Sequence, residues 1–403
     1  MKNFFGGALL LLGALVLSGC SGIGGGESAS APPDVKVIPG DGGATITWTM
    51  ESGVEYWVFS AAAPSVSPES WASLPQAKVV RNGTSPQIVT GLTNGTTYSF
   101  TVNGRKSGGP GGSGSPSISI IPRLAGLVWT LGTPLASTNL KGLGFAFVIY
   151  PGIYVTVGAG GTAFGSVDAI TWTAVTTGVT ADLNAVAYGG GNHVAVGAGG
   201  TVINSLDALA WTTRTSGTTN DLNSIVLGSN GLVAVGNNGA VLRSNDGGNG
   251  WVVGASGTTA NLYGVAFGSG RYIAVGAGGT VLTSADGDTW TAQTSGTTRE
   301  LRSVAYSAAR TLYAAVGANG TIITSPDAVT WTSLASVTTN TLNSVNYGNQ
   351  FTVAGNAGTI LVSTDGVTFQ AVPSGTTSNL NAVLFGLLGY GIVGVGGVNL
   401  SSY

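Results

Sequence analysis

The sequence predicts an all-β protein in which a small β-sandwich precedes a seven-bladed β-propeller. The first observation is composition: 68 of the 403 residues are Gly, Thr and Ser are abundant, and only 7% of residues are charged. This composition is typical of short strands joined by tight turns. The second observation is a period of about 40 residues over residues 127–403, with four strand-like segments in each period. That period and strand number are typical of propeller blades.

The N-terminal residues predict export and lipidation. An apolar run over residues 4–17 is too short to span a membrane as a mature helix. The only Cys of the chain, Cys20, ends a Leu-Ser-Gly-Cys sequence that resembles the lipobox of bacterial lipoproteins. The resemblance implies a signal peptide (1–19), an acylated Cys20 and a Gly/Ser tether (20–31). Ser21 implies the outer membrane, on its periplasmic face or at the cell surface. The alternative is plain secretory cleavage beside a chance Cys.

Residues 32–123 predict the β-sandwich. Residues 44–48 alternate between polar and apolar, as expected of a half-buried strand that ends in a large aromatic, Trp48. Leu92 lies six residues before Tyr98, which opens another strand, and this spacing resembles the tyrosine corner of fibronectin type III domains. The resemblance implies core positions for both aromatic residues and a role as a spacer or a docking module.

Residues 127–403 predict seven repeats that align on two kinds of residue. Both alignments step by 43, 39, 40, 39, 41 and 38 residues. The aromatic positions are Trp129, Trp172, Trp211, Trp251, Trp290, Trp331 and Phe369, and the Leu positions are Leu140, Leu183, Leu222, Leu262, Leu301, Leu342 and Leu380. In the second repeat the strands are expected at 183–189, 193–197, 201–205 and 211–214.

The two ends of the repeat region predict how the propeller closes. The seventh repeat lacks a fourth strand, whereas residues 127–130 form a fourth strand that no first three strands precede. Pairing the two removes both open sheet edges, which otherwise favour aggregation. We therefore expect the N-terminal strand of the repeat region to complete the last blade.

A second motif, Ser-x-Asp followed by Trp or Phe, lies between the third and fourth strands of six repeats. These repeats resemble the Asp-box (BNR) propellers, which include sialidases, sortilin-like receptors and the photosystem II stability/assembly factor family, and they look most like the last group. The resemblance implies that the six Asp residues are structural, each accepting N–H groups of its own turn. They are Asp168, Asp207, Asp246, Asp286, Asp327 and Asp365.

Residue counts exclude several function classes. The net charge is −2, whereas a general nucleic-acid binder needs a basic face. One Cys and one His exclude a Cys/His zinc site and an intramolecular disulfide. No cofactor and no metal are predicted, and the single His193 is expected to be a surface or packing residue. Residues 127–403 hold ten acids, of which four lie outside the Asp-boxes: Asp182, Asp221, Asp288 and Glu300.

A sialidase-like site needs three Arg around a carboxylate, a Tyr–Glu nucleophile pair and an acid/base Asp. Glu300 is the only Glu of the repeat region. The sequence therefore favours a non-catalytic protein with no catalytic residues. It predicts a membrane-anchored lipoprotein whose propeller presents a binding face to a protein or polysaccharide partner of the cell envelope, in a scaffold, assembly or adhesion role. A glycan-active enzyme is the alternative.

One constellation remains as a candidate site. The residues on either side of each repeat Leu are mostly polar, and in a propeller they lie near the central channel. We expect them to form a polar collar that binds a glycan, peptide or cation through amides and carboxylates. The alternative is that they only cap the preceding Ser-Gly-Thr-Thr turns. The predicted collar consists of Asp182, Asn184, Asp221, Asn223, Tyr263, Glu300, Arg302, Asn343 and Asn381.

Overall fold

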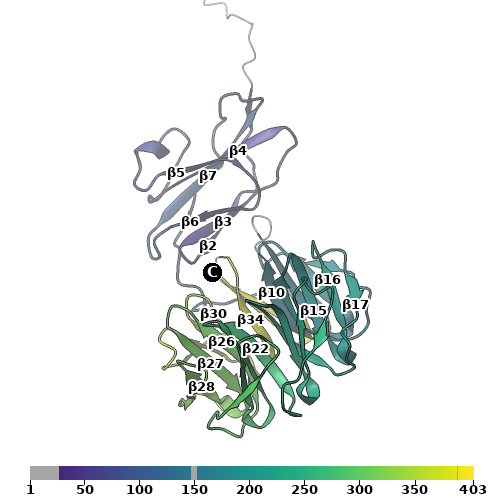
Figure 1. Cartoon of the computed structure of the whole chain (residues 1–403). Coiled ribbons are helices and arrows are strands. Elements are labelled where there is room, and N and C mark those ends of the chain that lie inside the picture. Colours follow the sequence, from purple (N-terminus) through teal and green to yellow (C-terminus); the bar gives the residue numbers. More distant parts are fainter. Residues whose placement is uncertain (1–26, 147–151, 388) are drawn as a thin grey trace, which may run out of the picture.

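The computed structural model describes residues 27–146, 152–387 and 389–403, which form two all-β units (Figure 1). The predicted signal peptide, Cys20 and the start of the predicted tether lie outside these residues. Within the described residues, no helix has the length and apolar character needed to cross a membrane.

The N-terminal unit is built from two sheets packed around one core. One sheet has the order β2-β3-β6, and the other has the order β1-β7-β4-β5, with β8 beside β7. Its strands are β1 (Ser28–Ala29), β2 (Lys36–Gly40), β3 (Gly43–Thr47), β4 (Val54–Ala61), β5 (Lys78–Gly83), β6 (Gln87–Thr90), β7 (Tyr98–Lys106) and β8 (Ile118–Ile120). A short 3-10 helix, η1 (Trp71–Ser73), lies between β4 and β5.

Two details of this unit bear on the sequence analysis. Trp48, Tyr56 and Tyr98 are all in its core, at most 5% exposed. The Thr93 N–H donates to the Tyr98 hydroxyl at 3.2 Å, which fixes the turn before β7. Ser28 and Ala29 pair with Arg105 and Gly104 of β7. The predicted tether is therefore too long, because these two residues are a strand of the sandwich.

The C-terminal unit consists of seven four-stranded antiparallel sheets, which are numbered here in chain order. Their first strands are β10 (Leu140–Ala146), β14 (Leu183–Gly189), β18 (Leu222–Gly228), β22 (Leu262–Gly268), β26 (Leu301–Ser307), β30 (Leu342–Tyr347) and β34 (Leu380–Phe385). Their second strands are β11 (Ile153–Gly158), β15 (Asn192–Gly197), β19 (Gly231–Gly236), β23 (Arg271–Gly276), β27 (Leu312–Gly317), β31 (Phe351–Gly355) and β35 (Tyr390–Gly394).

The outer half of each sheet is shorter. The third strands are β12 (Ala163–Ser166), β16 (Val202–Ser205), β20 (Val241–Ser244), β24 (Val281–Ser284), β28 (Ile322–Ser325), β32 (Ile360–Ser363) and β36 (Asn399–Ser402). The fourth strands are β13 (Thr173–Val175), β17 (Thr212–Arg214), β21 (Val252–Val253), β25 (Thr291–Gln293), β29 (Thr332–Ser333) and β33 (Gln370–Val372), with β9 (Thr130–Leu131) in the seventh sheet.

Gly-rich 3-10 turns join the second and third strands of most sheets. They are η2 (Ala159–Gly161), η3 (Ala198–Gly200), η4 (Asn237–Gly239), η5 (Ala277–Gly279), η6 (Ala318–Gly320) and η7 (Val395–Gly397), and residues 356–358 take this place in the sixth sheet.

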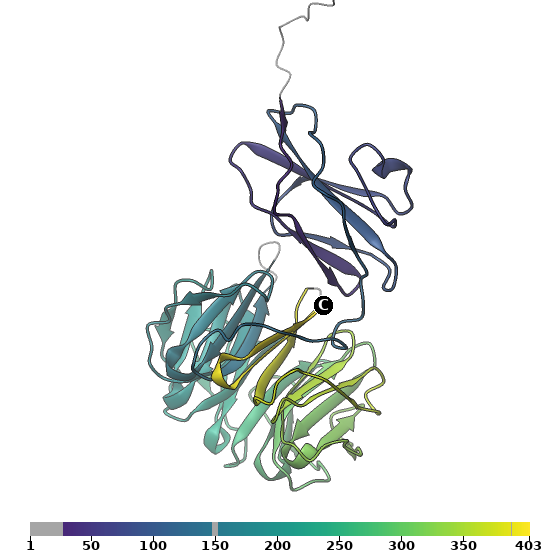
Figure 2. The same ribbon diagram turned by 180° about the vertical axis from the view of Figure 1, so that it is seen from behind.

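Hydrophobic packing between neighbouring sheets explains why the repeats need one another. Val194 and Val196 of the second sheet share one cluster with Leu222, Ile225 and Leu232 of the third. One repeat cannot bury such a face alone. The first strands contact one another in a closed cycle from β10 through β34 and back to β10. The sheets therefore surround a central channel, which residues of all seven first strands line. Figure 2 shows the sheets from behind.

The seventh sheet joins the two ends of the repeat region. β36 pairs with β9 through Leu400 with Leu131 and Ser401 with Thr130. The Ser402 hydroxyl accepts the Gly126 N–H at 2.8 Å, and Trp129 Nε1 donates to the Gly126 carbonyl at 2.9 Å. In the third sheet, Ser244, Gly248 and Trp251 make the same two bonds. The seventh sheet thus has an Asp-box corner without the Asp, assembled from both ends of the region.

The sandwich contacts the propeller at one end of the channel. Arg123 Nε donates to the Tyr403 carbonyl at 2.9 Å, and Gln350 Nε2 donates to the Ala125 carbonyl at 2.9 Å. Asn349, in the β30–β31 turn, also donates to the Asp41 carboxylate. These contacts lie where the first strands end. The opposite end, where the first strands begin, carries the predicted collar.

Candidate functional site

The predicted collar lines the mouth of the channel at the end away from the sandwich. A cavity of about 170 Å³ there is lined by the residue that follows each repeat Leu, from Lys141 round to Asn381. In every sheet a register shift between the first and second strands falls at this residue. Such a bulge takes the residue out of the strand pairing and re-aims its side chain. The collar is therefore built on seven equivalent bulges.

Four of these seven positions are Asn, and their amides join neighbouring sheets. Each Asn Nδ2 donates to the carbonyl of the repeat Leu of the next sheet, a contact called here the amide bridge. The bridges are Asn184 to Leu222 (2.9 Å), Asn223 to Leu262 (2.8 Å), Asn343 to Leu380 (2.8 Å) and Asn381 to Leu140 (2.7 Å). The last bridge crosses from the seventh sheet to the first. These four predicted site residues therefore already hold the ring together.

In five of the seven sheets, the residue before the repeat Leu makes a second structural contact, called here the turn cap. Its side-chain oxygen accepts the middle N–H of the Gly-rich turn in the preceding sheet. The turn caps are Asn139 to Gly396 (3.1 Å), Asp182 to Gly160 (2.8 Å), Asp221 to Gly199 (2.8 Å), Asn261 to Asn238 (2.9 Å) and Asn379 to Ala357 (3.0 Å).

The alternative hypothesis predicted that these residues cap turns, and in five sheets they do. The capped turns are the Gly-rich turns of the preceding sheet, however, and not the Ser-Gly-Thr-Thr turns. The Ser-Gly-Thr-Thr turns are bonded by their own side chains instead, as where Ser216 Oγ contacts the Thr218 N–H and carbonyl. Asp182 and Asp221 reach a turn about 22 residues away in the preceding sheet. A neighbouring blade, rather than the adjacent chain, satisfies these carboxylates.

The amide bridge and the turn cap are both missing in one sector of the ring. Tyr263 and Arg302 stand where other sheets have the bridging Asn, and Glu300 and Thr341 stand where a turn cap is expected. Among the described residues, none of these four makes the bridge or the cap. Glu300 accepts from Arg302 Nε at 2.6 Å, and Arg302 Nη1 donates to Asn343 Oδ1 at 3.0 Å. We call these four residues the open sector, which spans the fourth to sixth sheets.

Lys141 is the other departure from the bridging Asn, and like Arg302 it contacts the collar Asn of the next sheet. Its Nζ lies 2.8 Å from Asp182 Oδ2 and 3.0 Å from Asn184 Oδ1. The hydrogen bond from Lys141, together with the one from the Gly160 N–H, lowers the pKa of Asp182 below its ordinary value. The Lys141 and Asp182 side chains are 33% and 43% exposed, and the Arg302 and Glu300 side chains are 43% and 30% exposed, so both ion pairs are accessible at the channel mouth.

The six Asp-box carboxylates lie in the loops between third and fourth strands. Each accepts two backbone N–H groups of its own turn and its own Ser hydroxyl, as Asp286 does from Asp288, Thr289 and Ser284. Backbone hydrogen bonds lower the pKa of Asp286, Asp327 and Asp365 to about 2. A carboxylate held by N–H donors in this way supports the turn rather than proton transfer.

The remaining acids do not assemble a catalytic or metal site. Asp288 is paired with Arg243 at 2.8 Å, beside an Asp-box. Glu300 is held by Arg302, and the structure gives it no bond to Tyr263. Within the described ranges, no three His, Cys, Asp or Glu side chains come together in a group that could hold a metal.

His193 lies in the second strand of the second sheet and is 1% exposed. It is a packing residue in edge contact with Tyr188, with ring centroids 5.1 Å apart. Burial lowers the pKa of His193 to about 4, although the nearby Asp207 charge acts in the opposite direction. Its Nε2 makes no hydrogen bond to any described residue.

We expect stability to fall between pH 6.5 and pH 4 because of His193. The unfolded chain binds a proton near pH 6.5, whereas the folded chain does so only near pH 4, so acid favours the unfolded chain by about 1–3 kcal/mol over this window. Denaturant unfolding at several pH values should show this slope. The His193→Phe variant should lose it, since the chain has no other His. An unchanged slope would assign the effect to another group.

Sequence reasoning missed the other end of the channel. The fifth residue after each repeat Leu is aromatic in six of seven repeats, and the same alignment would have found it. These residues are Phe145, Tyr188, Leu227, Phe267, Tyr306, Tyr347 and Phe385.

Comparison with known proteins agrees with this architecture. Residues 217–400 match the family model described as Photosynthesis system II assembly factor YCF48. Among curated proteins, none matches the chain in sequence. A solved structure described as YCF48 bound to D1 peptide is 22% identical over 68% of this chain and 94% of that chain, with a TM-score of 0.56.

Two further solved structures resemble the chain. YCF48 from Cyanidioschyzon merolae is 18% identical, with 69% of this chain and 98% of that chain covered and a TM-score of 0.57. A catalytically inactive virginiamycin B lyase from Staphylococcus aureus with quinupristin is 11% identical, with 68% and 99% covered and a TM-score of 0.59. At these identities the likeness concerns the fold. Together with the matched segment it supports a BNR-like β-propeller.

Proposed function

We propose that this protein is a non-catalytic scaffold of the bacterial cell envelope, anchored to the outer membrane by a lipid on Cys20. A fibronectin type III domain serves as the spacer, which the Thr93 contact to the Tyr98 hydroxyl supports. The seven sheets are the blades of one propeller, closed by β9. Its polar end binds a protein partner, and the open sector is the binding site.

This proposal rests on one observation: the open sector lacks the amide bridges and turn caps that the same repeat positions make in most other sheets. Elsewhere the collar side chains are used to join sheets or cap turns. Among the described residues, Tyr263 makes neither contact, and Glu300 pairs with Arg302, whose hydrogen bond to the next sheet is to the Asn343 side chain. Asn or Asp at these places could make the bridge or the cap. Side chains that do not make the structural contact of their repeat position can contact a ligand instead. Tyr and Arg are also the residue types that dominate protein interfaces.

Two comparisons favour a protein partner. The matched family is described as an assembly factor, and one similar structure is described as YCF48 bound to D1 peptide. The open sector is half-exposed and has both charges and an aromatic ring, which suits a polypeptide. A polysaccharide partner is considered separately below.

Restoring the repeat rule should separate function from stability. In the Tyr263→Asn/Arg302→Asn variant, each new amide can form the missing bridge, so we expect the free energy of unfolding to stay equal or rise by up to about 1 kcal/mol. Partner binding should fall at least tenfold, because the contacting side chains are gone. Denaturant unfolding and photocrosslinking in the native host, with benzoylphenylalanine at position 263, measure the two effects.

The control places benzoylphenylalanine at Val253, which is 50% exposed at the outer rim of the third sheet. A defined protein crosslinked from position 263 but not from 253, and lost in the Arg302→Asn variant, would support the proposal. Equal crosslinks from both positions, or none from 263, would contradict it.

The membrane anchor makes a separate prediction. Cys20→Ser should move the protein from the membrane fraction to the soluble fraction and remove the acyl mass from its N-terminal peptide, as mass spectrometry of the purified chain can show. Retention in the membrane with no acyl mass on Cys20 would refute lipidation and leave the open sector untouched.

A sialidase-like enzyme is the second candidate, because the open sector contains both a Tyr (Tyr263) and a Glu (Glu300). A Tyr–Glu nucleophile needs the carboxylate on the phenol, and here Glu300 is bound by Arg302. Of the three Arg such a site needs, Arg302 alone lines the channel mouth. The arrangement favours binding over hydrolysis.

A further inference from the structure

The channel widens at the end where the sandwich is attached. A cavity of about 380 Å³ there is lined by all seven first strands. Five aromatic rings from the position missed by the sequence analysis line it, and we call this cavity the aromatic chamber. Its aromatic lining consists of Phe145, Tyr188, Phe267, Tyr306 and Tyr347. The Asn349 contact to Asp41 shows that the sandwich lies at this same end.

The chamber and the polar collar are separate sites. Between them, the third residue after each repeat Leu is aliphatic, and these side chains are at most 9% exposed. They are Leu143, Val186, Ile225, Val265, Val304, Val345 and Val383. This ring of aliphatic side chains divides the channel, so a ligand in the chamber would not touch the open sector.

The aromatic rings of the chamber are held in place by their own sheets. Each packs against a side chain of the second strand: Phe145 on Tyr154 (4.5 Å between centroids), Tyr188 on His193 (5.1 Å), Phe267 on Tyr272 (4.8 Å), Tyr306 on Tyr313 (4.5 Å) and Tyr347 on Phe351 (4.9 Å). Rings packed in this way need little ordering when a ligand binds. The chamber is thus a preorganised aromatic surface.

The polar groups of the chamber define the class of ligand. Among the described residues that line it there is no Asp, Glu, Lys, Arg or His, so a charged ligand would find no counter-charge from them. The hydroxyls of Tyr188, Tyr306 and Tyr347 make no hydrogen bond to any described residue. A purely apolar ligand would bury these hydroxyls without partners, which is unfavourable.

We propose that the aromatic chamber binds a neutral sugar unit, as part of an uncharged glycan. A pyranose ring has apolar C–H faces that can lie on the Phe and Tyr rings and hydroxyls that can pair with the phenols. The volume lies in the range typical of small-ligand sites, about 300–1,000 Å³. The open sector and the chamber are at opposite ends of the channel, so one molecule could join a protein to a polysaccharide. This inference does not rest on the protein partner.

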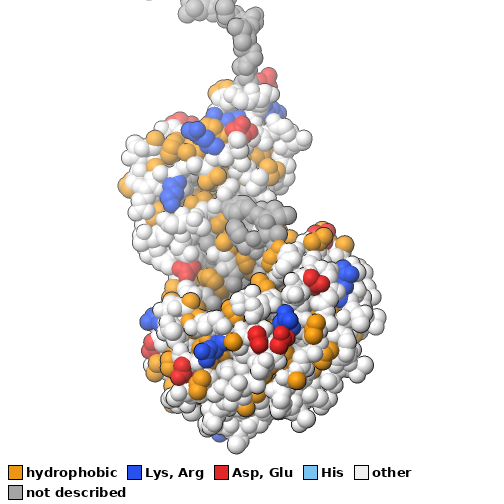
Figure 3. Space-filling model, viewed as in Figure 1, with side chains coloured by type: hydrophobic (Ala, Val, Ile, Leu, Met, Phe, Trp, Pro, Cys, Tyr) orange, Lys and Arg blue, Asp and Glu red, His pale blue; other side chains and the backbone are white. Residues whose placement is uncertain are grey.

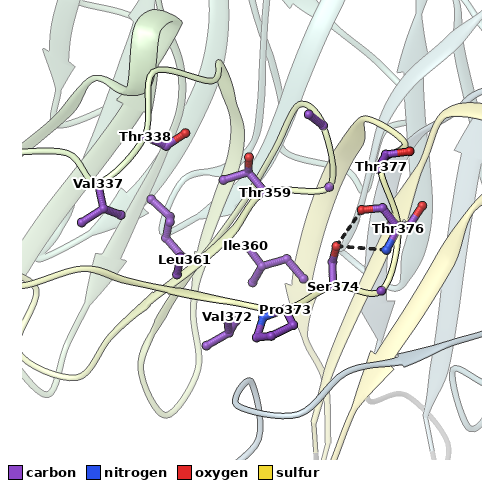
Figure 4. A pocket seen from close by; sticks show the side chains of 14 residues that line it. Val337, Thr338, Thr359, Ile360, Leu361, Val372, Pro373, Ser374, Thr376 and Thr377 are labelled. Carbon is purple, nitrogen blue, oxygen red and sulfur yellow. Dashed lines mark hydrogen bonds between the residues drawn. The ribbon is translucent and has the colours of Figure 1, made fainter.

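The other grooves on the surface give weaker evidence for a ligand site. The groove drawn in Figure 4, between Val337 and Ser374, has a floor of Ile360, Val372 and Pro373. Its hydroxyls are already used locally, as in the Ser374 bonds to Thr376. An equivalent groove recurs in the third sheet. The grooves are therefore a consequence of blade geometry.

The test uses the purified full chain in detergent and saturation-transfer NMR. The probes are the methyl glycosides of glucose, galactose, mannose and N-acetylglucosamine, with galacturonic acid and glucosamine as charged controls. We expect saturable binding of at least one neutral probe and none of the charged ones. Tyr306→Phe/Tyr347→Phe keeps both rings but removes two hydroxyls, and it should weaken that binding at least tenfold. Val253→Thr, at the outer rim of the third sheet, should leave it unchanged.

A second variant guards against misfolding. Leu227→Trp adds bulk at a chamber-lining side chain that is 45% exposed and at which six other repeats have an aromatic ring, so it should weaken binding at least tenfold while circular dichroism shows an intact fold. Binding that survives either chamber variant, equal binding of galacturonic acid, or no binding of any neutral probe would overturn the proposal. Binding of an apolar dye with no competition from the sugars would do the same.

Discussion

Gly279→Ala is expected to lower the free energy of unfolding by about 3–5 kcal/mol, because two costs act together. Gly279 has a φ of +75°, which L side chains rarely adopt, and a Cβ there would lie 1.9 Å from the Thr297 carbonyl. The carbonyl belongs to the connection to the next sheet and cannot move alone. Denaturant unfolding of the variant measures the loss.

The neighbouring Gly278 is the matched control. Its φ is +64°, but a Cβ there would meet nothing within 4 Å. Asn238 and Asn319 occupy this place in other sheets with similar φ values. We expect Gly278→Asn to change stability by less than about 1 kcal/mol, since Asn tolerates this conformation. A large loss in both variants would mean that φ dominates, and a small loss in both would mean that the connection yields.

The second large effect concerns ring closure. Trp129→Ala should lower the free energy of unfolding by about 2–4 kcal/mol, somewhat less than the truncation of a fully buried aromatic side chain, because Trp129 is partly buried. Trp129 packs against the hydrophobic cluster of the sixth and seventh sheets, with its ring centroid 6.3 Å from that of Tyr390. It also fixes the chain next to β9, whose pairing with β36 closes the seventh sheet. Hydrogen exchange should therefore accelerate in residues 399–402.

Trp251→Ala is the control for closure, because Trp251 holds the same corner in the third sheet. It should be destabilising by a similar amount but should leave residues 399–402 protected. If both variants expose β36 equally, the propeller unfolds as one unit and the closing strand has no special role. If neither does, β9 is held by contacts other than Trp129.

Both changes matter for function because the binding ends depend on a rigid ring. The Gly-rich turns present the N–H groups that the turn caps bind, and those caps set the position of the collar. Charged side chains are sparse on the face of the molecule drawn in Figure 3, and the ion pairs of the collar are Lys141–Asp182 and Arg302–Glu300. Small shifts of the ring would therefore separate the side chains of the open sector from one another.

Much of the fold follows from local pattern. The four strands expected in the second repeat agree with β14 to β17 within one residue at each end. Alternation and Gly-rich turns act over a few residues, so a single sequence displays them. The pairing of the N-terminal strand with the last sheet also followed from counting strands. The end of the tether was wrong, because Ser28–Ala29 find their partner in β7, far along the chain.

Only part of the candidate site could be predicted from the sequence. The alignment placed nine polar side chains at one end of the channel, and the structure brings them to that end. It could not show that Asn184, Asn223, Asn343 and Asn381 are bound to the next sheet, since those partners lie a full repeat away or, for Asn381, 241 residues away. Which residues are free is decided by contacts between repeats.

The sequence by itself determined the repeat period, the strands, the Asp-box positions and the shortage of catalytic acids. The tertiary structure alone decided which collar residues form amide bridges or turn caps, that Ser402 completes a corner begun by Gly126, and that aromatic rings form a chamber at the opposite end. The physical reason is the distance along the chain between the residues that interact. Strand and turn preferences are properties of neighbouring residues, whereas the hydrogen-bond partner of a polar side chain in a closed ring comes from the adjacent sheet.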